Sequence, residues 1–276
     1  MEILEYYASQ SSFTDPGKNS GMYEGLPTDA QSICKTVDGI CLDFNERWKY
    51  PIQNERWLEM NNRYVDENLD SVKALNKTAK ITEERPADQK MMASVSHMAS
   101  ICVSMLRHVG IPARKRIGYV DDGNEFATYE IVEYYDKAED SWKVLDPNGK
   151  CTGFIPAAQA FFDVKNGKSD EKKYVNADTC GMEIIIANLI LDLAYVTKKE
   201  RISWDRYGWM QRPLDEFSFR AWEILAGAAD LLLNDDKNID ALEACYESEE
   251  GLRVPQIIYC DSPVIPPHKA VIRFIK

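Results

Sequence analysis

One stretch decides the fold: LRHVGIPARKRIGY, at residues 106–119, where a predicted helix gives way to a predicted strand. We predict the helix from about residue 89 to 109. Three strands should follow at about 114–120, 126–136 and 141–146, because the runs DDGN and DKAED between them are typical of hairpin turns. This order of helix and strands predicts an α+β fold, with the helix packed on a small antiparallel sheet.

Further helices are predicted on both sides of this core. Residues 28–47 show apolar side chains at three- and four-residue spacing, which indicates one buried helical face that includes Cys34 and Cys41 as core residues. The other predicted helices are 54–75, 156–166, 181–199, 215–233 and 237–248, and residues 254–276 have room for one or two short edge strands. We expect three segments packed as one unit: 1–90 with an N-terminal arm and helices, 91–212 with the core and its helical extension, and 213–276.

Composition restricts the class of protein. A chain of 276 residues with 45% apolar and 28% charged residues is typical of a globular protein with a sizeable core. Its formal net charge of −12 repels phosphate backbones, so we expect no nucleic-acid partner. The sequence does not specify an oligomeric state.

The cysteines and the termini predict a reduced, cytoplasmic protein. The seven cysteines are odd in number and show no Cys-x-x-Cys spacing, which argues against a disulfide framework and a zinc knuckle. The N-terminus shows no signal peptide, and the longest apolar run, 184–196, is too short to span a membrane and predicts a buried helix. With three histidines and no paired ligand spacing, we expect no metal and no cofactor.

Residues 91–148 resemble the core of the transglutaminase-like superfamily, cysteine enzymes with a papain-like fold. The resemblance is carried by GIPAR at 110–114, EYYD at 133–136 and WKVLDPN at 142–148. The resemblance extends from about residue 6 to 233, and over this range the chain is similar to a bacterial branch of the superfamily. The residues that carry this wider resemblance are Tyr7, Thr14, Asp15, Glu55, Arg56, Asn61, Arg63, Asn188, Asp192 and the run WDRYG at 204–208. A motif set of this length is more specific than any of its parts.

The resemblance implies a triad of Cys, His and Asp, of which this chain keeps one member. Counting back from Arg107 and Gly110 places Val95 at the nucleophile position. Counting back from Glu133 places Tyr129 at the histidine position, so that only Asp146 matches. A valine supplies no nucleophile, and a phenol is protonated at neutral pH. We therefore predict a pseudoenzyme that binds a small molecule or a peptide in the former active cleft.

A different class of function remains open, namely a divergent amide hydrolase, cyclase or lyase. In this alternative Glu133 or Asp146 is the general acid or base, and Tyr129 donates to a developing oxyanion. Tyr129 and Glu133 lie four residues apart, so they share one face of their strand. In the structural interpretation, Tyr129 packs in the core, Glu133 pairs with an arginine and Asp146 caps a turn. A third option is an assembly partner that docks through helix 215–233.

The predicted ligand contacts are Val95, Arg114, Arg116, Trp204 and Asp205. Arg114 and Arg116 alternate onto one strand face, where they either meet a substrate carboxylate or form structural ion pairs. Trp204 and Asp205 belong to the aromatic run WDRYGW, which either closes the cleft or fills a corner of the core.

Other nucleophiles near Val95 are less well placed. Ser94 and Ser96 are one residue away, and a helix turns about 100° per residue, so neither side chain follows the direction of Val95. We expect His97 to be a surface or helix-capping residue. Cys102 shares the face of Val95 from about 10 Å along the helix, and we expect a buried, inert thiol.

Overall fold

The computed structural model describes residues 3–177, 179–262 and 268–273. A six-stranded mixed sheet lies at its centre, in the order β6-β3-β4-β7-β8, with β5 also paired to β4. The strands are β3 (Ala113–Asp121), β4 (Phe126–Asp136), β5 (Ser141–Leu145), β6 (Phe154–Pro156), β7 (Tyr174–Asn176) and β8 (Thr179–Cys180). The antiparallel β3–β4 and β4–β5 hairpins are the ones that the turn runs predicted, and the α+β fold class is confirmed.

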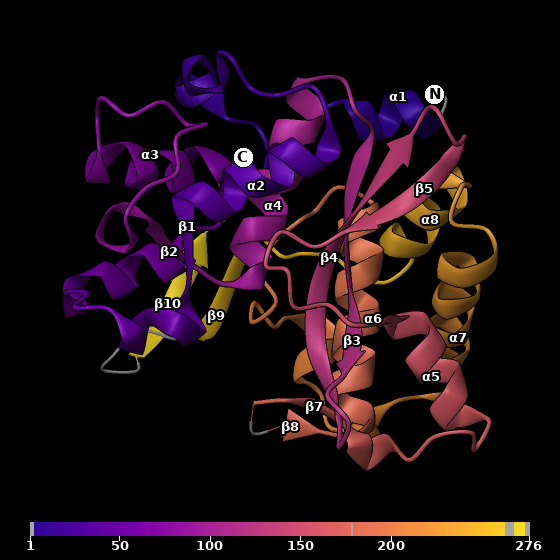
Figure 1. The fold of residues 1–276 in the computed structure, drawn as a ribbon. Coiled ribbons are helices and arrows are strands. Elements are labelled where there is room, and N and C mark those ends of the chain that lie inside the picture. Colours follow the sequence, from indigo (N-terminus) through magenta and orange to yellow (C-terminus); the bar gives the residue numbers. More distant parts are fainter. Residues whose placement is uncertain (1–2, 178, 263–267, 274–276) are drawn as a thin grey trace.

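Helices cover the sheet on both sides (Figure 1). Helix α4 (Val95–His108) packs against β3 and β4, and α2 (Ala30–Ile40) and α3 (Val65–Leu75) pack on α4. Helix α6 (Met182–Val196) packs on β3 and carries the C-terminal helices. The remaining helices are α1 (Ile3–Ala8), α5 (Ala157–Lys165), α7 (Phe219–Asn234) and α8 (Ile239–Glu247).

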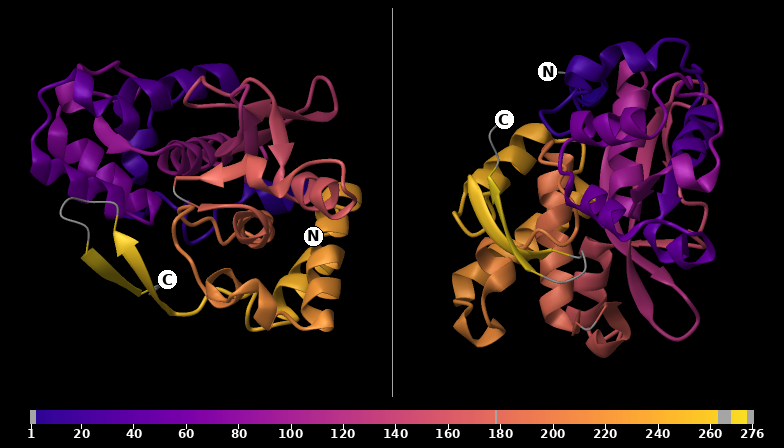
Figure 2. Two further views of the ribbon diagram at one scale, coloured as in Figure 1. Left: turned by 90° about the horizontal axis from the view of Figure 1, so that it is seen from below. Right: turned by 90° about the vertical axis from the view of Figure 1, so that its left-hand side faces the viewer.

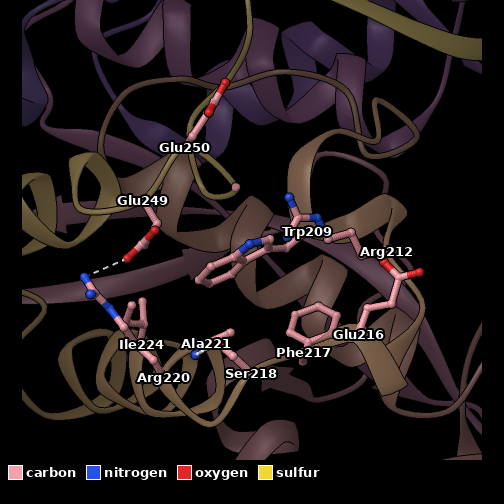
Figure 3. A pocket seen from close by; sticks show the side chains of 11 residues that line it. Trp209, Arg212, Glu216, Phe217, Ser218, Arg220, Ala221, Ile224, Glu249 and Glu250 are labelled. Carbon is pink, nitrogen blue, oxygen red and sulfur yellow. Dashed lines mark hydrogen bonds and ion pairs between the residues drawn. The ribbon is translucent and has the colours of Figure 1, made fainter.

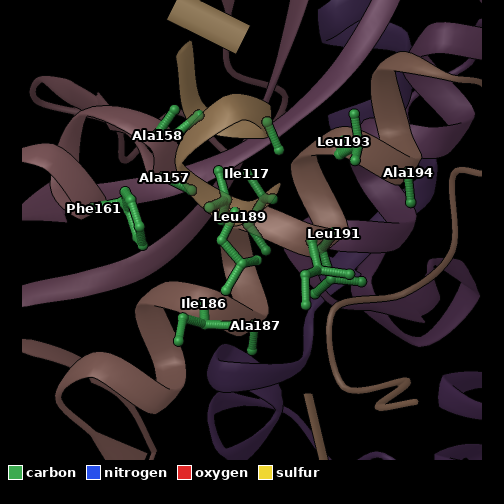
Figure 4. Close-up of a cluster of buried hydrophobic side chains, with 14 of the residues drawn as sticks. Ile117, Ala157, Ala158, Phe161, Ile186, Ala187, Leu189, Leu191, Leu193 and Ala194 are labelled. Carbon is green, nitrogen blue, oxygen red and sulfur yellow. The ribbon is translucent and has the colours of Figure 1, made fainter. Parts of the chain in front are cut away.

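The larger hydrophobic core surrounds α6, as Figure 4 shows. Every residue from 184 to 196 is buried, including the polar Asn188 and Asp192, so the predicted buried helix is confirmed. No helix in the described part of the chain is long and apolar enough to cross a membrane. The tight packing extends to Gly118 of β3, where an added Cβ would lie 2.1 Å from the carbonyl oxygen of Ile155 in β6, so only glycine fits.

Three predicted helices differ in the structure, two of them because distant segments pair as strands. The helix predicted at 28–47 ends at Ile40, and β1 (Cys41–Asp43) pairs in parallel with β2 (Met91–Ala93), which takes the start of the helix predicted from residue 89. Cys34 and Cys41 therefore do not share a helix. The predicted helix 54–75 is likewise divided into the 3-10 segment η3 (Asn54–Asn61) and α3.

The C-terminal strands form a separate hairpin. Strands β9 (Ile257–Ser262) and β10 (His268–Arg273) pair with each other and not with any other strand of the described residues, and Figure 2 shows them beside the rest of the molecule. The prediction of short strands here is correct. Short 3-10 segments occupy the connections η1 (Gly17–Tyr23), η2 (Phe44–Lys49), η4 (Ala87–Gln89), η5 (Glu171–Lys173), η6 (Gly208–Gln211) and η7 (Leu214–Glu216).

Candidate functional site

The N-terminal end of α4 lies against β4. Val95 is the first helical residue and is half-buried, while the next residue, Ser96, donates from Oγ to Glu130 Oε1 at 3.0 Å. This bond brings the backbone at Val95 near the backbone at Tyr129, while the side chains of Tyr129 and Glu130, as successive residues of β4, point to opposite faces of the sheet.

The hydroxyl of Tyr129 donates a hydrogen bond to the carboxylate of Asp146. This hydroxyl is 3.1 Å from both carboxylate oxygens. Asp146 also accepts three backbone N–H groups, from Asn148 at 3.0 Å and from Lys150 and Cys151 at 2.7 Å. The carboxylate thus holds the 146–151 loop and the phenol together. Burial and the neighbouring Asp146 both raise the pKa of Tyr129, so the phenol keeps its proton.

Glu133 belongs to a different group of charges from Tyr129, although both lie on β4. Its Oε2 is 2.7 Å from Nε of Arg114 and 3.1 Å from Nη1 of Arg116. Burial alone would raise the pKa of Glu133, but the two guanidinium groups outweigh it and lower this pKa to about 2. At neutral pH Glu133 is therefore a carboxylate with no proton to donate.

Arg114 and Arg116 are buried, at 1% and 3% exposure. Arg116 makes a two-pronged contact with Asp192 of α6, at 2.9 and 2.8 Å, and Asp192 also accepts the backbone N–H of Ile117 at 3.1 Å. Arg114 forms an ion pair with Asp236, after α7. The structural ion pairs foreseen for both arginines therefore form with Glu133, and Asp192 and Asp236 add further partners from later in the chain.

Trp204 and Asp205 face different partners. Asp205 is fully buried and contacts Arg63 through both oxygens, at 2.8 and 3.3 Å. Trp204 is half-buried, and its ring centroid lies 5.7 Å from that of His97. The indole Nε1 of Trp204 is buried and has no hydrogen-bond partner among the described residues. A buried donor left in this state has capacity for an acceptor from outside.

His97 is buried rather than at the surface, with 1% exposure. Its Nε2 lies 3.1 Å from the carbonyl oxygen of Asn62, and its Nδ1 lies 2.9 Å from Oγ of Ser94, the N-cap of α4. Burial, with help from the charges of Arg63 and Lys115, lowers the pKa of His97 to about 3, so the imidazole is neutral at pH 7. The predicted helix-capping role is present, but the surface position is wrong.

A second buried polar group was missed by sequence reasoning. Lys115 has no exposed surface, and its Nζ lies 2.7 Å from Oγ of Ser96, 2.7 Å from the carbonyl oxygen of Arg201 and 3.1 Å from Glu130. Tyr195 of α6 donates to the same carboxylate at 2.7 Å. A lysine between Arg114 and Arg116 on a central strand was the available signal, since a buried charge requires a partner. The Ser96 hydroxyl is therefore fully engaged, because it donates to Glu130 and accepts from Lys115.

The thiols give no candidate nucleophile beside His97. The six cysteines whose side chains the structure describes are free. Cys102 is fully buried, and this burial raises the pKa of its thiol well above the usual range, so the prediction of a buried thiol is confirmed. Within the described residues, no three His, Cys, Asp or Glu side chains are grouped so as to hold a metal ion.

A cavity of about 400 Å³ opens in the C-terminal extension, as Figure 3 shows. It is lined by η6, the start of α7 and residues 249–251, and Arg220 and Glu249 form an ion pair at its edge, 2.9 Å apart. None of the described residues that line it belongs to the set predicted from sequence.

Comparison with known families agrees with the geometry of the core. Residues 53–147 match the family model described as the Transglutaminase-like superfamily, so this part of the chain is a transglutaminase-like core domain. The match includes Val95, Tyr129, Glu133 and Asp146, whereas the wider resemblance from 6 to 233 stays a prediction. No curated protein and no solved structure matches the chain.

Proposed function

We propose that the transglutaminase-like core binds a small molecule or a peptide beside Val95, Tyr129 and Trp204, and that it does so without thiol-dependent catalysis. Val95 stands at the position where the family has its cysteine, and Tyr129 stands at the position of its histidine. Because the nucleophile and the base act as a unit, the absence of both removes the family chemistry.

The hydrogen bond from Tyr129 to Asp146 carries this proposal. A histidine at this position would donate one proton to the carboxylate and keep a free nitrogen as the base. Tyr129 makes the same contact to Asp146, but it has no second basic atom, and its raised pKa keeps the hydroxyl protonated. The Tyr129–Asp146 pair therefore stabilises the local structure of the site, and it cannot remove a proton from a substrate.

The surroundings favour a ligand that accepts hydrogen bonds. Val95, Tyr129 and Trp204 are each half-buried, and the indole N–H of Trp204 has no partner among the described residues. The charged candidates Arg114, Arg116 and Asp205 are buried in ion pairs. We therefore expect an apolar group with a carbonyl or ether oxygen rather than a ligand held by its own charge.

The divergent-enzyme alternative based on Glu133 and Asp146 has less support. Glu133 is held ionised by two arginines, and the oxygens of Asp146 already accept four hydrogen bonds. The lowered pKa of Glu133 is far from neutral pH, where an efficient acid or base would titrate, and the oxygens of Asp146 are already engaged.

The test is ligand binding. Native mass spectrometry of the purified protein looks for a retained small molecule, and a thermal-shift screen with a dipeptide library looks for a stabilising one. Val95→Trp should fill the site and abolish the shift. Tyr129→Phe is tested in the same screen. Its matched control is Tyr135→Phe, because Tyr135 lies on the same strand and also donates to an aspartate, Asp140. Shifts that persist in Val95→Trp would place the ligand elsewhere.

A further inference from the structure

A serine and a histidine are joined by a hydrogen bond at the start of α4. Ser94 is the N-cap and is half-buried, and its Oγ lies 2.9 Å from Nδ1 of His97. This distance is within the range that a nucleophile and its general base require. The two residues are three apart, so the helix geometry brings them to the same side.

The second ring nitrogen fixes the tautomer. Nε2 of His97 lies 3.1 Å from the backbone carbonyl oxygen of Asn62, which can only accept a hydrogen bond. Nε2 must therefore carry the proton, and Nδ1 must present its lone pair to Ser94, whose backbone N–H lies 3.3 Å from Nδ1 and whose Oγ lies closer, at 2.9 Å. The Ser94 hydroxyl thus donates to His97, and Asn62 orients the ring as a third group would in a catalytic triad.

The environment adds an unpaired donor and a route from solvent. The ring of Trp204 packs against that of His97, and its buried N–H has no partner among the described residues. Ser94 keeps part of its surface exposed, in contrast to Ser96, which is 1% exposed and bonded to Lys115 and Glu130. Ser94 is therefore the accessible one of the two hydroxyls that flank Val95.

We infer that Ser94 is a nucleophile and His97 its general base, for acyl transfer from an activated ester or thioester. This goes beyond the proposed binding function, since it gives the start of α4 a reactive oxygen where the family has a sulfur one residue later.

Oγ of Ser94 forms a bond to the acyl carbon while its proton moves to Nδ1 of His97. The bond from that carbon to the leaving group then breaks, and the leaving group departs as an anion that takes the proton from Nδ1 afterwards. Water then attacks the acyl-serine, passes its proton through Nδ1 and releases the acid and the free serine.

The substrate class follows from the surroundings of the imidazole, which is 1% exposed and has the neutral carbonyl oxygen of Asn62, and not a carboxylate, at Nε2 to stabilise the protonated ring. The pKa of His97 is lowered to about 3, so the ring is always free to accept a proton but is a weak base. A weak base gives little help to a poor leaving group such as an amine. Aryl esters and thioesters, whose leaving groups depart as stable anions, are therefore the expected substrates, and amides are not.

The experiment uses the full-length protein, a fluorophosphonate probe and p-nitrophenyl acetate. The probe transfers its phosphonyl group to an activated serine and releases fluoride. We expect one label, on the peptide that contains Ser94. Ser94→Ala should reduce labelling and ester hydrolysis to background, and His97→Gln should reduce both by about 10²-fold or more, which is the usual share of a general base.

Ser218 provides a matched control. It is the N-cap of α7 and is more exposed than Ser94, but Ala221 stands where α4 has His97. Ser218 should remain unlabelled, and Ser218→Ala should change nothing. If Ser94→Ala fails to fold, Ser94→Gly keeps an acceptable cap without a hydroxyl.

Absence of a label on Ser94, or equal labelling in His97→Gln, would overturn the inference. Because the probe is applied without any other ligand, a negative result leaves the binding test with Val95→Trp unaffected, and failure of that test leaves the labelling result unaffected.

Discussion

Two polar regions of this protein differ in how they use their side chains. The first is the ionic framework, defined here as Arg63–Asp205, Arg107–Glu200, Arg114–Glu133–Asp236 and Arg116–Asp192. The second comprises Ser94 and His97 at the start of α4 together with Tyr129 and Asp146, where the contacts are hydrogen bonds of hydroxyl groups, an imidazole and one carboxylate and not ion pairs.

The difference indicates which residues serve the fold and which remain for chemistry. In the framework, charges of opposite sign pair with each other and are buried except for the half-buried Glu133 and Asp236, and they join the core to residues 192–236. Three of the polar residues that carry the wider resemblance, Arg63, Asp192 and Asp205, belong to it. At the start of α4 the hydroxyl of Ser94 is partly exposed and a donor of Trp204 is unpaired.

The largest effect is expected from breaking the framework. Asp192→Ala leaves the buried Arg116 guanidinium without its two-pronged partner and the N–H of Ile117 without an acceptor. Unpairing a buried charge costs about 3–5 kcal/mol, so the urea midpoint should fall sharply. Asp70→Ala is the control, because its ion pair with Lys18 is exposed to solvent and contributes little. Equal losses in the two variants would remove the distinction between the regions.

The pH dependence of stability tests the buried imidazole. Folding lowers the pKa of His97 from 6.5 to about 3, through burial and the charges of Arg63 and Lys115. The folded state therefore binds fewer protons than the unfolded state between these values. Stability is fully present above pH 6.5 and falls by up to about 1.4 kcal/mol per pH unit below it.

His97→Gln should remove this slope between pH 6.5 and 5, as measured by urea unfolding at each pH. Glu133 also destabilises the fold in acid, but only below its ordinary pKa of 4.5. Its contribution is present above pH 4.5 and is lost as the pH falls toward 2, so the two windows overlap below pH 4.5 and, of these two groups, only His97 acts between pH 4.5 and 6.5. A slope that is unchanged in His97→Gln would show that another group controls this range.

A smaller effect is expected at the Tyr129–Asp146 pair. Tyr129→Phe removes one hydrogen bond, while Asp146 keeps its three backbone donors. The loss should be about 0.5–1.5 kcal/mol, well below that of Asp192→Ala. Thermal unfolding of Tyr129→Phe, with Tyr135→Phe as the control variant, measures this loss of stability. A loss as large as that of a framework residue would assign Tyr129 to the structural group.

The smallest effect concerns the thiols. Cys180 is exposed and should react quickly with iodoacetamide, whereas Cys102 is buried and should stay unmodified in the folded protein. Mass spectrometry of tryptic peptides distinguishes them. Rapid and selective modification of Cys102 would restore a thiol to the candidate chemistry.

Much of the fold could be predicted because it depends on local pattern. The DDGN and DKAED runs determine two hairpins, and the apolar run at 184–196 determines a buried helix, since both signals lie within one element. The parallel pairing of β1 with β2 joins residues about 50 positions apart, and helical periodicity continues through both segments, so it could not be seen in the sequence.

The candidate site divides in the same way. Sequence alone determined that the core resembles the transglutaminase-like family, and it predicts Val95 and Tyr129 at two of the family's catalytic positions, because motif spacing is a property of the chain. Only the tertiary structure decided that Glu133 joins the arginines while Tyr129 joins Asp146, and that His97 turns inward to accept from Ser94. The partner of a polar side chain depends on which distant groups are buried beside it, and packing sets that choice.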